Sequence, residues 1–194
     1  GVLVGVKDAQ CYNCGRRNPG LWGFGPSLRA LGGDLGFVPF VIGASVVTYI
    51  LTLVFSSGMI GSGGLMSFGS PSTAALFTFG ASGRVPVFEF GRWWTVLSAA
   101  WLHGGVLHIL FNMMWVRNLA PATAEIYGPG RTVILYTVAG VCGFAASSLA
   151  GAYLSWFPLP MLRGAQFTVG ASAAIFGLLG ALVYYGRRSG SSAV

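Results

Sequence analysis

The chain has 194 residues, of which 54% are hydrophobic and only 8% charged, and its mean hydropathy is +0.72. Soluble domains carry about 25% charged residues, so this composition excludes an ordinary soluble enzyme and indicates a multi-pass membrane protein. The net charge of +7 does not predict nucleic-acid binding, because the sequence has neither a basic face nor an aromatic platform. We expect the lipid bilayer, and no nucleic acid, as a partner.

Residues 1–36 are polar to mixed, and we expect them to form an N-terminal segment on the cytoplasmic side. Within CYNCG (11–15), Cys11 and Cys14 have the spacing of a zinc knuckle. Structural zinc takes four ligands, so this pair is half a site. Two interpretations stay open: a truncated zinc ribbon that holds structural zinc in the full-length protein, and a loop without metal. We expect no cofactor for catalysis.

The apolar runs that follow predict an all-α bundle of membrane-spanning helices. A span needs about 20 apolar residues, and the predicted spans lie at about 37–55, 106–117, 132–157 and 170–186. The membrane domain then covers 37–188, and a Ser/Gly tail covers 189–194. The connection at 56–105 is long enough to predict a functional or partly structured loop. Its apolar side chains indicate that it lies on the membrane surface or dips into the membrane.

The basic residues predict an orientation. If the N-terminus is cytoplasmic, that side holds eight Lys and Arg residues and the other side holds three. The positive-inside rule then favours a cytoplasmic N-terminus, in what we expect to be a bacterial inner membrane. The fourth helix begins on the outer side, so Ser172 is expected a few residues below that surface.

Small residues four apart predict close packing of the third and fourth helices. Such rows let the backbones of membrane helices approach each other closely. They are Gly143, Ser147 and Gly151 in the third helix, and Ala173, Gly177 and Ala181 in the fourth.

Polar residues inside a membrane raise the question of function, because they are costly there. His108 and Asn112 are four apart and so lie on one helix face. Two convergent donors suit an oxyanion hole, and the alternative is ordinary hydrogen bonding between helices. His103 is separated from His108 by Gly104–Gly105, which places it in the preceding loop.

Ser172 is the candidate nucleophile. Gly170 and Ala173 leave room around it, and the start of a helix offers unpaired N–H groups. The alternative is a small packing residue, the commonest use of serine in membrane helices. A serine nucleophile also needs a base, usually a histidine, and the spacing does not assign that role.

Two stretches taken together, HGGVLHILFN (103–112) and GASAAIFG (170–177), resemble the signatures of the rhomboid intramembrane serine proteases. The resemblance runs from about residue 37 to residue 188. It implies that Ser172 is the nucleophile and that His108, Asn112 and the Ser172 backbone N–H form the oxyanion hole. His103 matches a structural histidine of the family, and Phe176 matches an aromatic position under the catalytic histidine.

The resemblance also implies limits. The family's general base lies on a sixth membrane helix, so we expect this chain to be a fragment of a bundle of six or more helices, inactive alone. The implied function is cleavage of transmembrane protein substrates, and the alternative is an inactive rhomboid-like protein that binds transmembrane helices. Arg92 precedes Trp93 and Trp94, whereas the family has a Trp-Arg pair, so the bonds of this arginine stay open.

Overall fold

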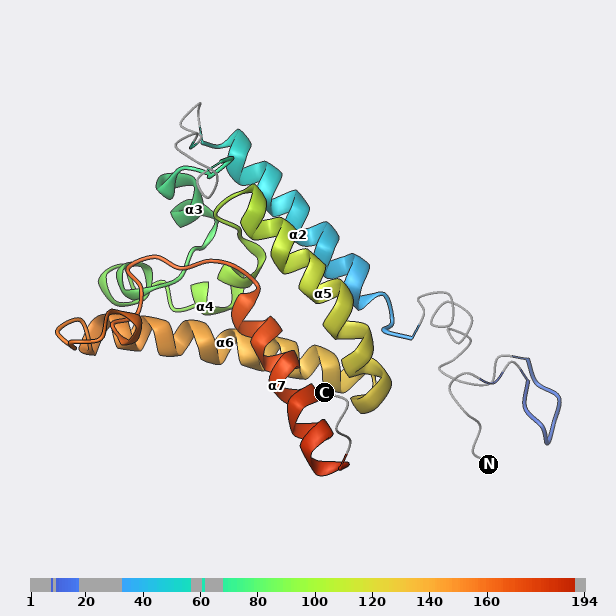
Figure 1. The fold of residues 1–194 in the computed structure, drawn as a ribbon. Coiled ribbons are helices and arrows are strands. Elements are labelled where there is room, and N and C mark those ends of the chain that lie inside the picture. The colour runs from blue at the N-terminus through green and yellow to red at the C-terminus, as the bar shows by residue number, and fades with distance from the viewer. Residues whose placement is uncertain (1–7, 9, 18–32, 57–60, 62–67, 191–194) are drawn as a thin grey trace.

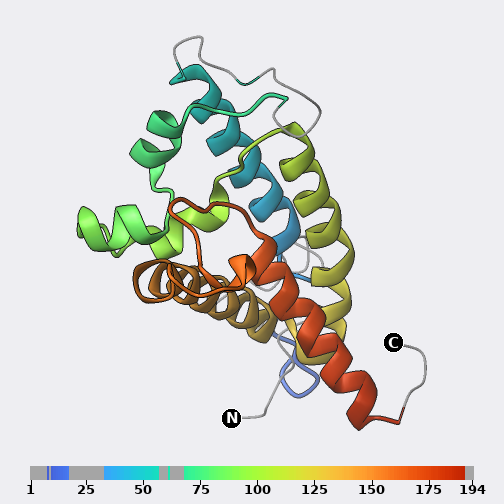
Figure 2. The same ribbon diagram turned by 60° about the vertical axis from the view of Figure 1, so that its left-hand side comes forward.

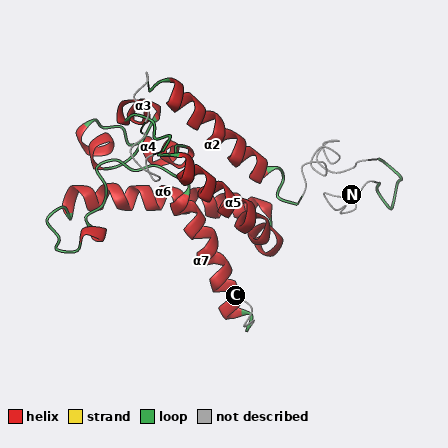
Figure 3. Ribbon diagram, turned by 45° about the horizontal axis from the view of Figure 1, so that its top comes forward, coloured by secondary structure: helices red, strands yellow, loops and turns green. Residues whose placement is uncertain are grey.

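The computed structural model describes residues 8, 10–17, 33–56, 61 and 68–190. Most of the predicted segment 1–36, parts of the loop 56–105 and the end of the tail 189–194 therefore lie outside the described residues. The described part consists of helices joined by loops, with isolated β-bridges and no strand (Figure 3). The prediction of an all-α helical bundle is confirmed.

Helices α2 (Phe37–Val54) and α5 (Val106–Tyr127) run side by side (Figures 1 and 2). The chain enters α2 through Asp34, whose carboxylate accepts the backbone N–H groups of Gly36 and Val38. These groups lack partners within the helix, so Asp34 fixes where α2 begins.

Helix α7 (Ser172–Arg188) packs against both α6 (Pro129–Tyr153) and α5. The predicted rows of small residues meet here at Gly143 and Ala173, and Gly177 meets Ala139, one turn before Gly143. A Cβ added to Gly143 would lie 2.5 Å from the Cβ of Ala173, and one added to Gly177 would lie 2.2 Å from the Cβ of Ala139. The two backbones therefore cross at a distance that only glycine at these positions permits, as the small-residue rows predict.

The connection between α2 and α5 is partly helical. It contains α3 (Thr73–Phe79), the π-helical turn η2 (Val85–Glu89), α4 (Thr95–Ser98) and the 3₁₀ turn η3 (Ala99–Trp101). Arg92 donates to the carbonyls of Phe77 and Thr78 at the end of α3. Its guanidinium also lies 4.3 Å from the Phe77 ring centre and 4.7 Å from that of Trp94. The displaced arginine thus ties α3 to the entry of α4.

Several helices in the structure begin or end at other residues than the sequence predicts. The helix predicted at 106–117 continues to Tyr127, because the chain offers no strong stop until Gly128, whose φ is 84°. Pro121 lies inside it and removes one backbone donor without ending it. The helix predicted at 132–157 covers Pro129–Tyr153, since proline suits a first helical position. The one predicted at 170–186 begins at Ser172, after Gly170 with φ 119°.

By length and composition, α2 and α6 can each cross a membrane. The pair formed by Thr95–Trp101 and Val106–Tyr127, bent by 93°, gives a third span if it counts as one. Helix α7 has 17 residues, slightly fewer than the usual span of about 20, so its crossing stays a prediction. Large apolar side chains are exposed along α2, α5 and α6, as expected of helices that face lipid. The protein is an integral membrane protein.

Candidate functional site

Helix α5 presents His108 and Asn112 on one face, as their spacing predicts. The Nδ1 atom of His108 accepts the backbone N–H of Gly104 at 3.3 Å. In a neutral imidazole the proton is then on Nε2, which is the ring nitrogen beside Gly170. Asn112 is 5% exposed, and one of its amide protons bonds the His108 carbonyl at 2.8 Å. His108 therefore offers a donor to the space in front of α7, and Asn112 keeps a second amide proton.

His103 lies in the turn between η3 and α5, as Gly104–Gly105 predicts, and its side chain is fully buried. Its ring packs edge-on against that of His108, with 5.3 Å between ring centres. His103 thus contacts the His108 ring directly.

Ser172 is the first residue of α7, and it is exposed. The preceding loop is held in place by backbone bonds. Ser82 and Thr168 form an antiparallel bridge, with distances of 3.0 and 2.7 Å between the backbone nitrogen of each and the carbonyl oxygen of the other. The backbone N–H of Gly170 donates to the Ala99 carbonyl, with 2.9 Å between nitrogen and oxygen. The position of Ser172 is therefore set by the connection between α2 and α5 as well as by α7.

At Gly170, the backbone that leads into α7 comes close to the His108 side chain of α5. Its φ of 119° is one that residues with a side chain rarely adopt, and an added Cβ would lie 2.5 Å from His108 Nε2. The backbone two residues before Ser172 therefore touches the His108 ring.

A cavity of about 300 Å³ between α5 and α7 is lined by all three catalytic residues that the resemblance implies, Ser172, His108 and Asn112. The chain spacing did not identify the other lining residues, although each is three, four or seven positions from a predicted one and so shares its helix face. They are Phe111, Trp115, Leu119, Ile175 and Leu179.

Phe176 also lines this cavity, and its side chain is 70% exposed. Among the described residues no histidine stacks on it, so its expected role under a catalytic histidine stays a prediction. What the cavity offers is an exposed hydroxyl beside a mainly apolar wall and two N–H donors, one on the half-buried His108 and one on the buried Asn112.

The predicted half-site for zinc is a compact turn apart from this cavity. The Cys11 N–H bonds the Arg16 carbonyl and the Gly15 N–H bonds the Cys11 carbonyl, both at 2.9 Å. Backbone hydrogen bonds from Cys14 and Asn13 lower the pKa of the Cys11 thiol, which favours the thiolate that metals bind. The described residues contain no group of three metal-binding side chains, so the zinc ribbon stays a prediction.

Comparison with known proteins agrees with this geometry. The family model for the Rhomboid domain matches residues 90–192. Rhomboid protease GluP of Bacillus subtilis is 37% identical over 94 residues, which cover 48% of this chain and 16% of that protein. RHOMBOID-like protein 7 of Arabidopsis thaliana is 30% identical over 161 residues, covering 75% and 48%. RHOMBOID-like protein 5 of the same plant is 35% identical over 95 residues, covering 49% and 28%.

The matched domain spans more than half of the chain and includes α5, α6, α7 and the whole cavity at Ser172. The chain belongs to the rhomboid family. It spans less than half the length of these relatives.

Proposed function

We propose that the protein is an intramembrane serine endopeptidase that cleaves transmembrane substrates. The observation that carries this proposal is the shared cavity of Ser172, His108 and Asn112, which come from two helices far apart in the sequence. An exposed hydroxyl beside two N–H donors is the arrangement needed for attack on a carbonyl and for binding the oxyanion that follows. The name of one relative, Rhomboid protease GluP, supports the same reaction.

In this proposal Ser172 Oγ attacks the scissile carbonyl. The negative charge that develops on the carbonyl oxygen is bound by His108 Nε2–H, the free amide proton of Asn112 and the backbone N–H of Ser172. His108 serves as a donor and not as the base, because the Gly104 N–H occupies its Nδ1 atom and leaves the proton on Nε2. The base is the histidine that the family resemblance puts on a later membrane helix.

The mainly apolar cavity wall favours a substrate that arrives from the membrane. Phe111, Trp115 and Phe176 are each about half exposed or more, at 56%, 47% and 70%. Their side chains form an apolar surface beside Ser172, which suits the side chains of a transmembrane segment. We propose that Ser172 faces the outer side of the membrane, as the distribution of basic residues favours.

The test is labelling of the full-length protein in detergent with a serine-reactive fluorophosphonate. Wild-type protein should be labelled and Ser172→Ala should not, whereas the control Ser147→Ala, on α6, should be labelled as wild type. Asn112→Ala should keep Ser172 and lose one oxyanion donor, which costs roughly 10²- to 10³-fold in kcat. Folded wild-type protein that takes no label would contradict the protease and favour the alternative, a rhomboid-like protein that binds transmembrane helices without cleaving them.

A further inference from the structure

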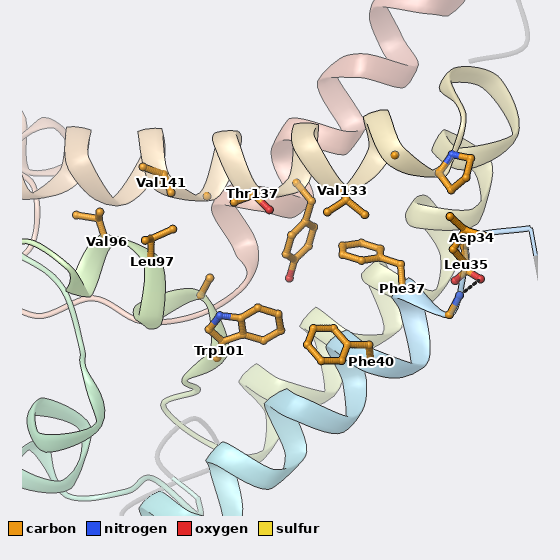
Figure 4. A pocket seen from close by; sticks show the side chains of 16 residues that line it. Asp34, Leu35, Phe37, Phe40, Val96, Leu97, Trp101, Val133, Thr137 and Val141 are labelled. Carbon is orange, nitrogen blue, oxygen red and sulfur yellow. Dashed lines mark hydrogen bonds between the residues drawn. The ribbon is translucent and has the colours of Figure 1, made fainter. Parts of the chain in front are cut away.

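A second cavity, of about 400 Å³, lies between α2, the α4–η3 segment and α6 (Figure 4). It shares no lining residue with the cavity at Ser172. Phe37, Phe40 and Trp101 form one wall, and α6 contributes Val133 and Val141 to the facing wall (Figure 4). None of these residues has a part in the proposed reaction.

Tyr136 gives this apolar cavity one polar group without a partner. Its side chain is 3% exposed and lines the cavity, and its ring packs edge-on against Phe37 at 5.2 Å between centres. Its hydroxyl is buried and has no hydrogen-bond partner among the described residues. A buried polar group left without a partner is destabilising, so a ligand that accepts this hydrogen bond is favoured.

The size and place of the cavity favour a lipid chain over a protein segment. Both long walls, α2 and α6, belong to helices that can cross the membrane, so bilayer lipid surrounds them. A helix about 10 Å wide with a pitch of 5.4 Å occupies roughly 420 Å³ in each turn. The cavity could hold at most about one turn, whereas an acyl chain is narrow enough to extend through it.

One end of the cavity carries a negative charge. Asp34 is the only charged side chain among the described residues that line it, and it lies at the end where Pro129 and Gly130 begin α6. The carboxylate already accepts the N–H groups of Gly36 and Val38, and its remaining lone pairs can accept hydrogen bonds from an ammonium group, which an anionic headgroup without one does not offer. Tyr136 is seven residues beyond Pro129, about 10 Å along the helix axis, and helical side chains lean toward the N-terminal end. Its hydroxyl can therefore reach the upper part of a lipid whose headgroup is at Asp34.

We propose that this cavity binds a phospholipid with an ammonium headgroup, of the phosphatidylethanolamine type. The ammonium group lies at Asp34, an ester carbonyl accepts the Tyr136 hydroxyl, and one acyl chain extends along α6 toward Val96, Leu97 and Val141.

The test measures lipid binding to the full-length protein by native mass spectrometry after delipidation in detergent. Dioleoyl-phosphatidylethanolamine should bind several-fold more tightly than dioleoyl-phosphatidylglycerol, and Asp34→Asn should abolish that preference. Val133→Trp fills the cavity and should weaken binding at least tenfold. Its control, Val138→Trp, lies on the same helix at a position that does not line the cavity, and should bind as wild type.

Tyr136→Phe separates a lipid contact from a structural role. It should weaken phosphatidylethanolamine binding by about two- to tenfold, the range that one net hydrogen bond gives. Without lipid it should melt at or above the wild-type temperature, because it removes a buried hydroxyl that has no partner. Equal binding of the two lipids by wild type, or wild-type binding by Val133→Trp, would overturn the proposal.

Discussion

Gly170 meets two constraints at once, one from its own backbone and one from His108. Its φ is 119°, and an added Cβ would lie 2.5 Å from His108 Nε2. Gly170→Ala should therefore strain the backbone by about 1–2 kcal/mol and push Ser172 away from the His108 ring. We expect a lower melting temperature and a loss of fluorophosphonate labelling of at least tenfold.

The control for this variant is Gly180→Ala on α7, the helix that follows Gly170, where an added Cβ meets nothing within 4 Å. It should label as wild type and melt at the same temperature or slightly above it, because alanine favours helix by about 0.5–1 kcal/mol over glycine. Wild-type labelling by Gly170→Ala would show that the contact with His108 does not position Ser172.

The sequence indicated Gly170 as a small neighbour that leaves room around Ser172, and the structure adds a close contact with the His108 ring. The residue that needs the room is His108, more than 60 positions earlier in the chain. Local spacing could place His108 and Asn112 on one face, since both lie on one helix. It could not bring Ser172 to them, because that contact depends on how α5, α6 and α7 pack. That part of the site was predicted by the resemblance, together with the place of Ser172 at the outward-facing start of a helix.

At the scale of helices, the crossing of α6 and α7 is set by matched small residues. Gly177 faces Ala139 so closely that an added Cβ would lie 2.2 Å from the Ala139 Cβ. Gly177→Ala should overpack this crossing and destabilise the protein by about 1–3 kcal/mol. The measurement is thermal unfolding in detergent micelles.

A second variant shows whether the loss of stability in Gly177→Ala arises at the contact with Ala139. Ala139→Gly removes the opposing methyl group, so the double variant Ala139→Gly, Gly177→Ala should recover much of the lost stability. Gly43→Ala on α2, where an added Cβ meets nothing within 4 Å, should change little. A double variant no more stable than Gly177→Ala alone would place the destabilisation elsewhere.

The sequence predicted this crossing well and the helix ends less well. Small residues four apart are a local pattern, and the structure brings them together as predicted. The end of α5 was predicted at residue 117, where charged residues begin, but charge does not stop a helix. The helix ends at Tyr127, before Gly128, and the Tyr127 hydroxyl bonds the Ala181 carbonyl of α7 at 2.8 Å. Such a tertiary contact cannot be deduced from hydropathy.

At the scale of the whole molecule, the sequence predicted a helical membrane protein because its charge is scarce and falls outside the long apolar runs. It could not predict the contacts that hold the loop between α2 and α5 in place. There Arg92 joins α3 to the start of α4, and the Ser82–Thr168 bridge joins this loop to the one before α7. Both contacts connect segments with no shared periodicity. The loop therefore belongs to the scaffold that positions Ser172.

The orientation of the bundle is the property that decides which side of the membrane Ser172 faces. Eight Lys and Arg residues against three favour a cytoplasmic N-terminus, with Arg163 outside and Ser189 inside. On a background in which Cys11, Cys14 and Cys142 are replaced, Arg163→Cys in intact bacterial spheroplasts should react with a membrane-impermeant maleimide. Ser189→Cys should react only after permeabilisation, since it follows α7 on the opposite side. The reverse pattern would place Ser172 toward the cytoplasm, and reaction of both cysteines in intact spheroplasts would show that α7 does not cross the membrane.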